Sequence, residues 1–326
     1  MKKKLVLVTG QAGDAQGWGN MHVTEAVRDA VLASGIDCRI LWAESPAELE
    51  KGLSAAPCDL VWSSLYFFSS RADIIGAADA DIVWVADLLD RWKIPYVGPS
   101  AQTMKNLIGK FTTHEILSKA GVRVPKHLLC PPSRAEDVDF FPAFVKPNGE
   151  SRSIGISDKS VAETPEALAA QIRFIQQELG QEALIEEYLP GREYTVMVIG
   201  NGKYQEILPG QVTVAKEHYG KYPILRSDLR GVGLTKISIP TEHFDEAVEL
   251  ARQASAALDC RDHIRIDMRE GADGRLRIME VNGIPGLKPV KSWSPQIFAL
   301  YHPDGDPYQG LISTIVHAAL NSIESA

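Results

Sequence analysis

The 326-residue chain has few cysteines, no long apolar run and no excess of positive charge. The widely spaced cysteines include no C-x-x-C pair, which excludes a zinc-ligand pattern and a disulfide framework: Cys38, Cys58, Cys130 and Cys260. A formal net charge of −8 argues against nucleic acid or an anionic membrane surface as the main partner. No stretch reaches transmembrane length, and the apolar run after the N-terminal lysines is too short for a signal peptide. We therefore expect a cytoplasmic protein.

Residues 4–99 alternate strand and helix patterns, which is typical of a parallel βαβ sheet. Strands are expected at 5–9, 38–42, 59–63 and 95–97, and helices at 21–34 and 81–92, with a Gly-rich loop at 10–20. After Gly98-Pro99-Ser100, helices are expected at 101–107, 112–120 and 165–179 and a strand at 143–146. The pattern Thr112-x-x-Glu115 predicts a capping box. Further strands are expected at 183–187, 193–199 and 204–208, an irregular stretch at 210–235, and helices at 242–258 and 310–323.

A β-hairpin over residues 263–282 contains the most informative residues of the chain. Side chains alternate along a strand, so Arg265 and Asp267 share one face, and Glu280 and Asn282 share a face of the return strand. In the usual register these four side chains converge. The patch is consistent with a hydrated sheet face or with a Mg²⁺ site, and magnesium takes only one or two carboxylates together with substrate phosphates. The metal interpretation therefore requires a nucleotide site elsewhere in the chain.

A lysine followed by a loop of small residues is the first candidate for such a site. Lys146 ends a buried strand and precedes the Gly/Ser loop at 148–155. Such a loop folds its backbone N–H groups around phosphate oxygens, and the lysine supplies a point charge. Lys110 is a candidate second phosphate contact. Taken singly, a solvent-exposed lysine and a simple turn explain the same residues.

The stretch 183–196 is more specific. An apolar strand leads into Glu186 and Glu187, and Glu193 opens the next strand seven residues after Glu186. Adenine binds backbone polar groups and an apolar slot, and a ribose needs a carboxylate that accepts hydrogen bonds from its hydroxyls.

In this order and spacing, the chain resembles the ATP-grasp superfamily and, within it, the D-alanine–D-alanine ligase branch. The elements that match are Lys110, Phe144-Val145-Lys146-Pro147, the 148–155 loop, Glu186-Glu187-Tyr188-Leu189-x-Gly-x-Glu193, Arg265-x-Asp267 and Glu280-x-Asn282-x-x-Pro285-Gly286. The resemblance covers roughly residues 95–320. It implies an α/β ATP-grasp fold with three subdomains: a parallel βαβ pre-ATP-grasp domain at 1–98, a small central α+β domain at 99–184, and a C-terminal antiparallel-sheet catalytic domain at 185–326.

The resemblance also implies a function and a set of site residues. The implied reaction is ATP- and Mg²⁺-dependent ligation of a carboxylate and an amine of amino-acid-like substrates through an acyl phosphate, with Mn²⁺ as a possible substitute and a homodimer as a possible assembly. Implied ATP contacts are Lys110, Lys146, Gly149, Ser151, Ser153, Glu186, Glu187, Tyr188, Leu189, Glu193 and Met279. Implied metal ligands are Asp267, Glu280 and Asn282. Implied catalytic residues are Arg265, Ser153 and Arg152.

The acceptor half departs from the ligase pattern. The first-domain loop lacks the family's Glu, so Asp14 or His22 is a candidate substitute, and Ser63–Ser70 stands where the family has a His-Gly signature. Arg152 occupies the position of a catalytic Ser, and Lys291 that of a Ser that binds the product carboxylate. Candidate substrate contacts are Asp14, His22, Gly283, Lys288 and Lys291. The added positive charge favours an acid with more carboxylates than alanine, unless these side chains face solvent.

The stretch 210–235 fits a mobile loop that closes over the active site. Its basic and aromatic residues are candidates to reach phosphates on closure: Lys216, His218, Tyr219, Lys221, Arg226 and Arg230.

Three other functions remain open at this stage. The first is true D-alanine–D-alanine ligation, and the second is a nucleotide-binding sensor without turnover, against which the complete set of polar residues argues. The third is an oxidoreductase, because Gly10-x-x-Gly13-x-x-x-Gly17 loosely resembles a dinucleotide loop. That interpretation is weak, since the chain lacks Tyr-x-x-x-Lys and the acidic residue nearest the end of the second strand is Glu44.

Overall fold

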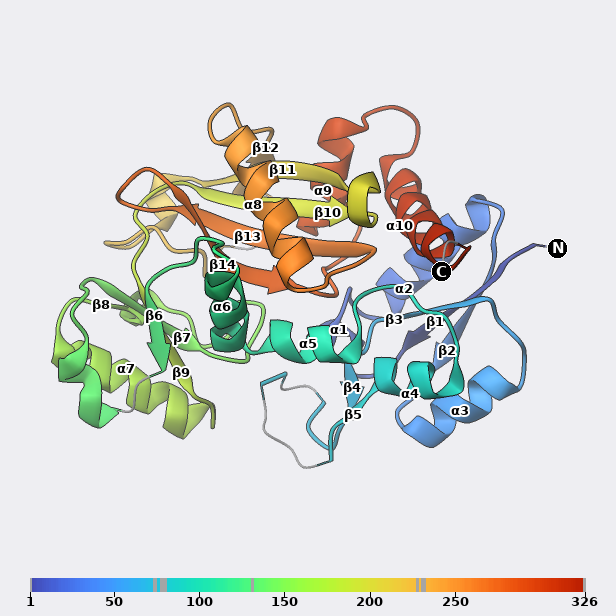
Figure 1. Cartoon of the computed structure of the whole chain (residues 1–326), viewed down its shortest axis with the longest axis horizontal. Coiled ribbons are helices and arrows are strands. Elements are labelled where there is room, and N and C mark those ends of the chain that lie inside the picture. The colour runs from blue at the N-terminus through green and yellow to red at the C-terminus, as the bar shows by residue number, and fades with distance from the viewer. Residues whose placement is uncertain are drawn as a thin grey trace.

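The computed structural model describes residues 2–72, 75–76, 81–129, 132–226, 229 and 233–324. The N-terminal unit is a parallel sheet in the order β2-β1-β3, formed by β1 (Lys4–Thr9), β2 (Asp37–Trp42) and β3 (Leu60–Ser63). Its helices are α1 (Gly13–Gln16), α2 (Met21–Ala33), α3 (Pro46–Ser54) and α4 (Val85–Trp92). The expected strand at 95–97 is reduced to one bridge between Val61 and Tyr96. A small antiparallel pair, β4 (Phe67–Phe68) and β5 (Val83–Trp84), lies to the left of α4 in Figure 1.

The central unit pairs helices with a four-stranded sheet in the order β6-β9-β7-β8. Its strands are β6 (His127–Leu129), β7 (Ala143–Pro147), β8 (Val161–Ala162) and β9 (Ala183–Glu187), and its helices are α5 (Ala101–Ile108), α6 (Lys110–Lys119) and α7 (Pro165–Glu178). The predicted capping box is wrong, because α6 begins two residues earlier, after Gly109, which makes no side-chain cap. The division at 184/185 stays a prediction, and β9 spans it while pairing entirely within this sheet.

The C-terminal unit is antiparallel, as the resemblance implied, and forms a five-stranded sheet in the order β12-β11-β10-β13-β14. The strands are β10 (Glu193–Ile199), β11 (Glu206–Val214), β12 (Thr235–Ser238), β13 (His263–Glu270) and β14 (Leu276–Asn282). The helices are α8 (Phe244–Ala257), α9 (Trp293–Tyr301) and α10 (Pro307–Glu324). The expected irregular stretch at 210–235 is wrong at its start, because β11 continues its ladder with β10 through Val212 and with β12 through Val214.

The five-stranded sheet packs on both sides (Figure 1). One face and α8 share an apolar core that includes Val196, Ile266 and Leu250. A second core joins α9 and α10 to the first unit, where Val27 of α2 clusters with Ile315 of α10. This shared core fixes the N-terminal unit against the C-terminal sheet. Among the described residues, no helix is both long and apolar enough to cross a bilayer.

Candidate active site

The hairpin of β13 and β14 has the predicted register. Arg265 pairs with Asn282, and Asp267 pairs with Glu280. The Asp267 carboxylate, only 5% exposed, accepts hydrogen bonds from Arg265 Nε at 3.0 Å and Nη2 at 2.8 Å and from Thr195 Oγ1 at 2.7 Å. Asn282 Nδ2 donates to the same carboxylate at 3.3 Å. The guanidinium and the oxygen donors therefore form one preorganised patch.

A β-bulge beside this patch presents a backbone carbonyl to the site. The register of β13 and β14 shifts after Asp267, so that Met268 pairs with Ile278 and Met279 is the extra residue. The carbonyl of Met279 accepts a hydrogen bond from Lys146 Nζ at 3.2 Å. The predicted involvement of Met279 thus has a local structural basis in the bulge.

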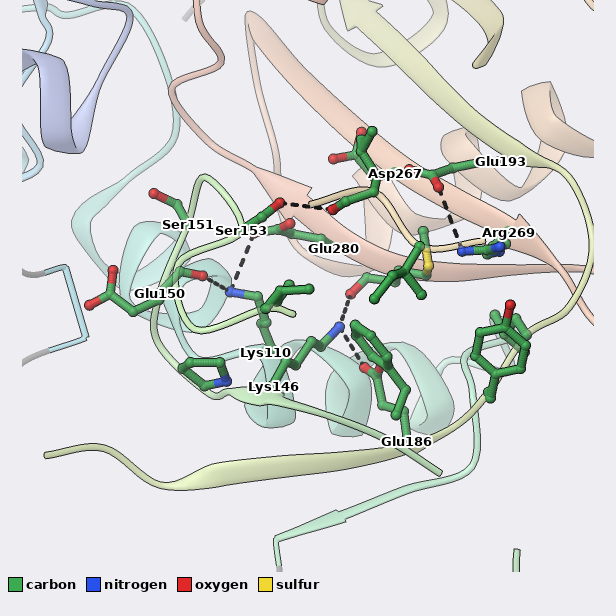
Figure 2. A pocket seen from close by; sticks show the side chains of 18 of the residues that line it. Lys110, Lys146, Glu150, Ser151, Ser153, Glu186, Glu193, Asp267, Arg269 and Glu280 are labelled. Carbon is green, nitrogen blue, oxygen red and sulfur yellow. Dashed lines mark hydrogen bonds and ion pairs between the residues drawn. The ribbon is translucent and has the colours of Figure 1, made fainter. Parts of the chain in front are cut away.

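Two buried lysines face the hairpin from the central unit. Lys110 Nζ lies 3.3 Å from Glu280 Oε1 and also donates to the carbonyl of Glu150. Lys146 Nζ lies 2.8 Å from Glu186 Oε1. Figure 2 shows the Lys110 ammonium group between Glu150 of the Gly/Ser loop and Glu280, and the Lys146 ammonium group beside Glu186.

Glu186 also contacts a histidine from α6. His114 Nε2 lies 2.6 Å from Glu186 Oε1, and both side chains are almost fully buried. Burial opposes the charge of this carboxylate, but Lys146 and the hydrogen bond from His114 prevail and lower the pKa of Glu186 to about 2. Burial lowers the pKa of His114, while Glu186 acts in the opposite direction. Glu186 is therefore ionised at neutral pH.

These elements line one cavity between the central sheet and the five-stranded sheet. Its polar lining comes from Lys110, Lys146, Glu150, Ser151, Ser153, Glu186, Glu187, Glu193, Asp267, Arg269 and Glu280, and its apolar lining includes Ile154, Leu189, Ile224, Leu225 and Met279. An apolar slot with cations at one end and carboxylates nearby suits a nucleotide with its phosphates.

Arg269 is a pocket residue that the sequence reasoning missed. It lies two residues beyond Asp267 on β13, and its guanidinium stands 5.6 Å from the centre of the Tyr188 ring and 3.7 Å from the Glu193 carboxylate. It also donates to the carbonyls of Gly191, at 3.1 Å, and Pro223. Side chains alternate along a strand, so Arg269 lies on the same face of β13 as Arg265 and Asp267. The sequence pattern could therefore have predicted it.

The segment after β11 covers the cavity with apolar rather than basic side chains. Ile224 and Leu225 line it, and the Leu225 carbonyl accepts a hydrogen bond from Ser153 Oγ at 3.2 Å. Lys221 instead pairs with Glu163, and Arg226 with Asp158 at 2.7 Å. Lys216, His218 and Tyr219 do not line the cavity among the described residues, and Arg230 lies outside the described residues.

The Gly/Ser loop has an unusual backbone. Arg152 and Ser153 both adopt positive φ, 56° and 60°, a conformation that non-glycine residues rarely occupy. The Arg152 side chain points outward to Asp14, with an N–O distance of 3.8 Å. At Gly149 a Cβ would lie 2.5 Å from the Cα of Gly76, so only glycine fits this approach to the first unit. The loop therefore contacts the first unit at two points, through Arg152 and through Gly149.

The predicted substrate contacts are not gathered at this cavity. His22 has an 88% exposed side chain next to Glu25, and Lys288 and Lys291 are also exposed. Gly283 is buried, and a Cβ there would lie 2.5 Å from Met104 Sδ, which gives this glycine a packing role. His22, Lys288 and Lys291 lie at the surface rather than in the cavity because water solvates a charged side chain better than a protein cavity does.

Tyr66, from the Ser63–Ser70 segment, is a second residue that the sequence reasoning missed. Its hydroxyl oxygen accepts a hydrogen bond from the N–H of Ile284 at 3.1 Å. Burial raises the pKa of Tyr66 to about 12, the charge of Glu280 adds to this, and Arg265 opposes it. The only sequence signal for Tyr66 is that it lies in a short segment rich in aromatic residues.

The donor set fits a hard divalent cation. Asp267, Glu280 and Asn282 offer two carboxylates and an amide oxygen, and the cations beside them suit the phosphates that would complete the coordination. Among the described residues, no group of three or more His, Cys, Asp or Glu side chains forms a closed metal cage. The arrangement therefore matches a metal shared with a phosphate ligand rather than a structural metal.

The comparisons with known proteins agree with this geometry. The family model described as D-ala D-ala ligase C-terminus matches residues 126–317. A D-alanine–D-alanine ligase of Halalkalibacterium halodurans is 30% identical over 245 residues, 72% of this chain and 77% of its own length. One of Thermoanaerobacter pseudethanolicus is 26% identical over 255 residues, 75% of this chain and 68% of its own. The solved D-alanine–D-alanine ligase of Bacillus anthracis, complexed with ATP, has a TM-score of 0.73 at 18% identity and covers 100% of this chain and 99% of its own.

Proposed function

Because this chain belongs to the D-alanine–D-alanine ligase family and is an ATP-dependent enzyme that forms C–N bonds, we propose that it joins two amino-acid-like substrates through an acyl phosphate. The observation that supports this best is the meeting of Lys110 and Lys146 with the Asp267–Glu280 pair in one cavity. The dinucleotide-loop interpretation is set aside. Gly17 serves local packing, since a Cβ there would lie 1.9 Å from the Ser64 carbonyl oxygen.

The proposed ATP orientation follows from the two ends of the cavity. Adenine would lie against Leu189 and Met279, near the ionised Glu186, and Glu193 would accept hydrogen bonds from the ribose hydroxyls. The phosphates would point toward Lys110 and Lys146 under the Gly/Ser loop. Two lysines neutralise phosphate charge and align the transferred group without covalent help from the protein.

Mg²⁺ is the proposed metal, and Mn²⁺ is a possible substitute. Asp267, Glu280 and Asn282 would hold it, and when bound it would neutralise charge on the transferred phosphoryl group. Arg265 is fixed by two hydrogen bonds to Asp267, so its remaining N–H groups are held in a defined direction. We propose that it stabilises the oxyanion that forms when an amine attacks the acyl phosphate.

The substrate specificity stays open between two D-alanines and other amino acids. Lys288 and Lys291 are exposed, and the positive charge that lines the cavity comes from Lys110, Lys146 and Arg269. A preference for an acid with extra carboxylates therefore has no support from these two residues. A homodimer, expected from the resemblance, is also a prediction, which sedimentation velocity tests.

Stimulated ADP release tests the proposal. The protein is incubated with MgATP and single amino acids or pairs of them, D-alanine included, and ADP, phosphate and the ligated product are measured. Amino-acid-dependent ADP release with an amide product supports a ligase, and nucleotide binding without release supports a sensor. Arg265→Ala should abolish turnover and keep the wild-type circular dichroism spectrum. Turnover near the wild-type rate in that variant would refute the site.

A further inference from the structure

A second, smaller cavity begins where the first ends. It shares Lys110, Glu150, Ser151 and Glu280 with the main cavity and continues to Asn282 and Tyr66. The shared residues include the lysine and the carboxylate at the proposed phosphate end. Whatever group receives the transferred phosphoryl group must lie beyond that end, in line with the bond that breaks. The second cavity therefore occupies the position of the phosphoryl acceptor.

Tyr66 enters this cavity from the first unit on a firmly held backbone. The buried side chain of Gln16 accepts hydrogen bonds from the N–H groups of Tyr66, at 2.7 Å, and Phe67, at 3.1 Å. Its amide nitrogen donates to the carbonyls of Phe67, at 3.1 Å, and Ala72, at 2.7 Å. These four hydrogen bonds of Gln16 fix the backbone on both sides of the short segment that carries Tyr66. Preorganisation of this kind is what a group that contacts a transition state requires.

The phenol is oriented with its proton available. Its oxygen already accepts the Ile284 N–H, two residues after Asn282, which fixes the oxygen beside the hairpin patch. No described residue accepts a hydrogen bond from the Tyr66 hydroxyl. A phenol has one proton to donate, so that proton remains free for a ligand in the cavity.

We propose that Tyr66 is a further catalytic residue, whose hydroxyl donates a hydrogen bond to the substrate carboxylate and to the oxyanion formed from it. This inference rests on the proposed ligase function and adds a second donor beside Arg265. It also gives a role to the Ser63–Ser70 segment, which replaces the His-Gly signature of the family.

The proposed reaction has two chemical steps, and neither requires Tyr66 to give up its proton. A carboxylate oxygen bonds to the γ-phosphorus of ATP as the bond to the ADP oxygen breaks. The amine nitrogen then bonds to the carbonyl carbon, inorganic phosphate leaves with the C–O electron pair, and one amine proton passes to solvent. Negative charge grows on the carbonyl oxygen in the second step, and a fixed donor there lowers the barrier.

Tyr66→Phe tests the proposal, because it removes the hydroxyl and keeps the ring. We expect kcat to fall on the order of 10–100-fold, less than the roughly 100–1,000-fold cost of losing a principal oxyanion donor because Arg265 remains, while KM for ATP changes less than about two-fold. Tyr96→Phe is the matched control, since its hydroxyl donates to Asp90 and the residue lines neither cavity. It should match wild type. Thermal unfolding of both variants shows whether either substitution perturbs the fold.

Three results separate the possible failures. If the wild-type protein releases no ADP with any amino acid, the proposed function fails before Tyr66 is tested. If wild type is active and Tyr66→Phe stays within two-fold of its kcat, the catalytic role of Tyr66 is overturned. If kcat falls only together with a lower melting temperature and a raised KM for ATP, Tyr66 is structural, and the proposal is again overturned.

Discussion

Asp267 and Glu280 lie directly opposite each other on β13 and β14, and each carboxylate is paired with a different cation. Arg265 from the same strand holds Asp267, whereas Lys110 from α6 reaches Glu280 from the central unit. One carboxylate thus belongs to a patch formed within a single sheet, and the other ties that sheet to the phosphate loop. Replacing either one should therefore affect catalysis, with different effects on the Lys110 side chain.

Asp267→Asn and Glu280→Gln should each lower kcat on the order of 100-fold or more, because each removes a negative ligand from the proposed metal. In Asp267→Asn the concentration of Mg²⁺ needed for half-maximal activity should also rise. ADP release measured over a series of Mg²⁺ concentrations checks both expectations. Asp273→Asn, in the exposed turn of the same hairpin, is the control and should match wild type. Equal Mg²⁺ dependence in Asp267→Asn and wild type would contradict the metal assignment.

Glu186→Gln should raise KM for ATP about ten-fold and lower kcat less. The substitution removes the charge that both Lys146 and His114 contact, so the lysine loses its fixed position beside the nucleotide. Steady-state kinetics with ATP as the varied substrate measures the effect. Glu182→Gln, an exposed carboxylate just before the same strand, serves as the control. A drop in kcat at unchanged KM would argue against a binding role for Glu186.

The sequence predicted the hairpin patch because two-residue alternation fixes which side chains share a strand face, and Arg265, Asp267, Glu280 and Asn282 lie where that rule places them. The resemblance, rather than periodicity, predicted the three-part fold and the antiparallel C-terminal sheet, but not its five strands or their order. Lys110 and Lys146 were identified only as members of an ordered set, since a single lysine has no local pattern.

Contacts between residues far apart in the chain could not be predicted from the sequence. Nothing near His114 indicates that it meets Glu186, 72 positions away, and nothing near Tyr66 indicates the N–H of Ile284. The charges of the stretch 210–235 suggested phosphate contacts on closure, which stays a prediction, and the sequence did not indicate that Lys221 and Arg226 pair with Glu163 and Asp158. Charge alone does not reveal which opposite charge lies nearest in the fold.

Arg269→Gln should raise KM for ATP about ten-fold, because the guanidinium joins Glu193, the Tyr188 ring and the Pro223 carbonyl at one end of the cavity. Loss of the Pro223 contact should also make the segment 215–226 more sensitive to trypsin. Kinetics and timed proteolysis measure the two effects. Arg252→Gln, on the exposed side of α8, should change neither. Wild-type proteolysis in Arg269→Gln would show that the segment is held by other contacts.

His263 makes the stability of the protein depend on pH. It is buried on β13, and among the described residues its Nε2 has no hydrogen-bond partner. Burial, and secondarily the charge of Arg265, lowers its pKa from 6.5 to about 3. Between these two values the unfolded chain binds a proton that the folded chain does not, so stability is complete above pH 6.5 and is lost as the pH falls toward 3.

His263→Leu should therefore flatten the acid side of the stability profile. Over pH 6 to 4 the wild-type protein should lose about 1.4 kcal/mol of unfolding free energy per pH unit more than the variant, which has no imidazole to protonate. Urea unfolding at several pH values measures this difference. His22→Gln removes an imidazole that is already in water, so its profile should follow wild type. Parallel profiles for wild type and His263→Leu would mean that the imidazole reaches solvent or a proton acceptor in the folded state.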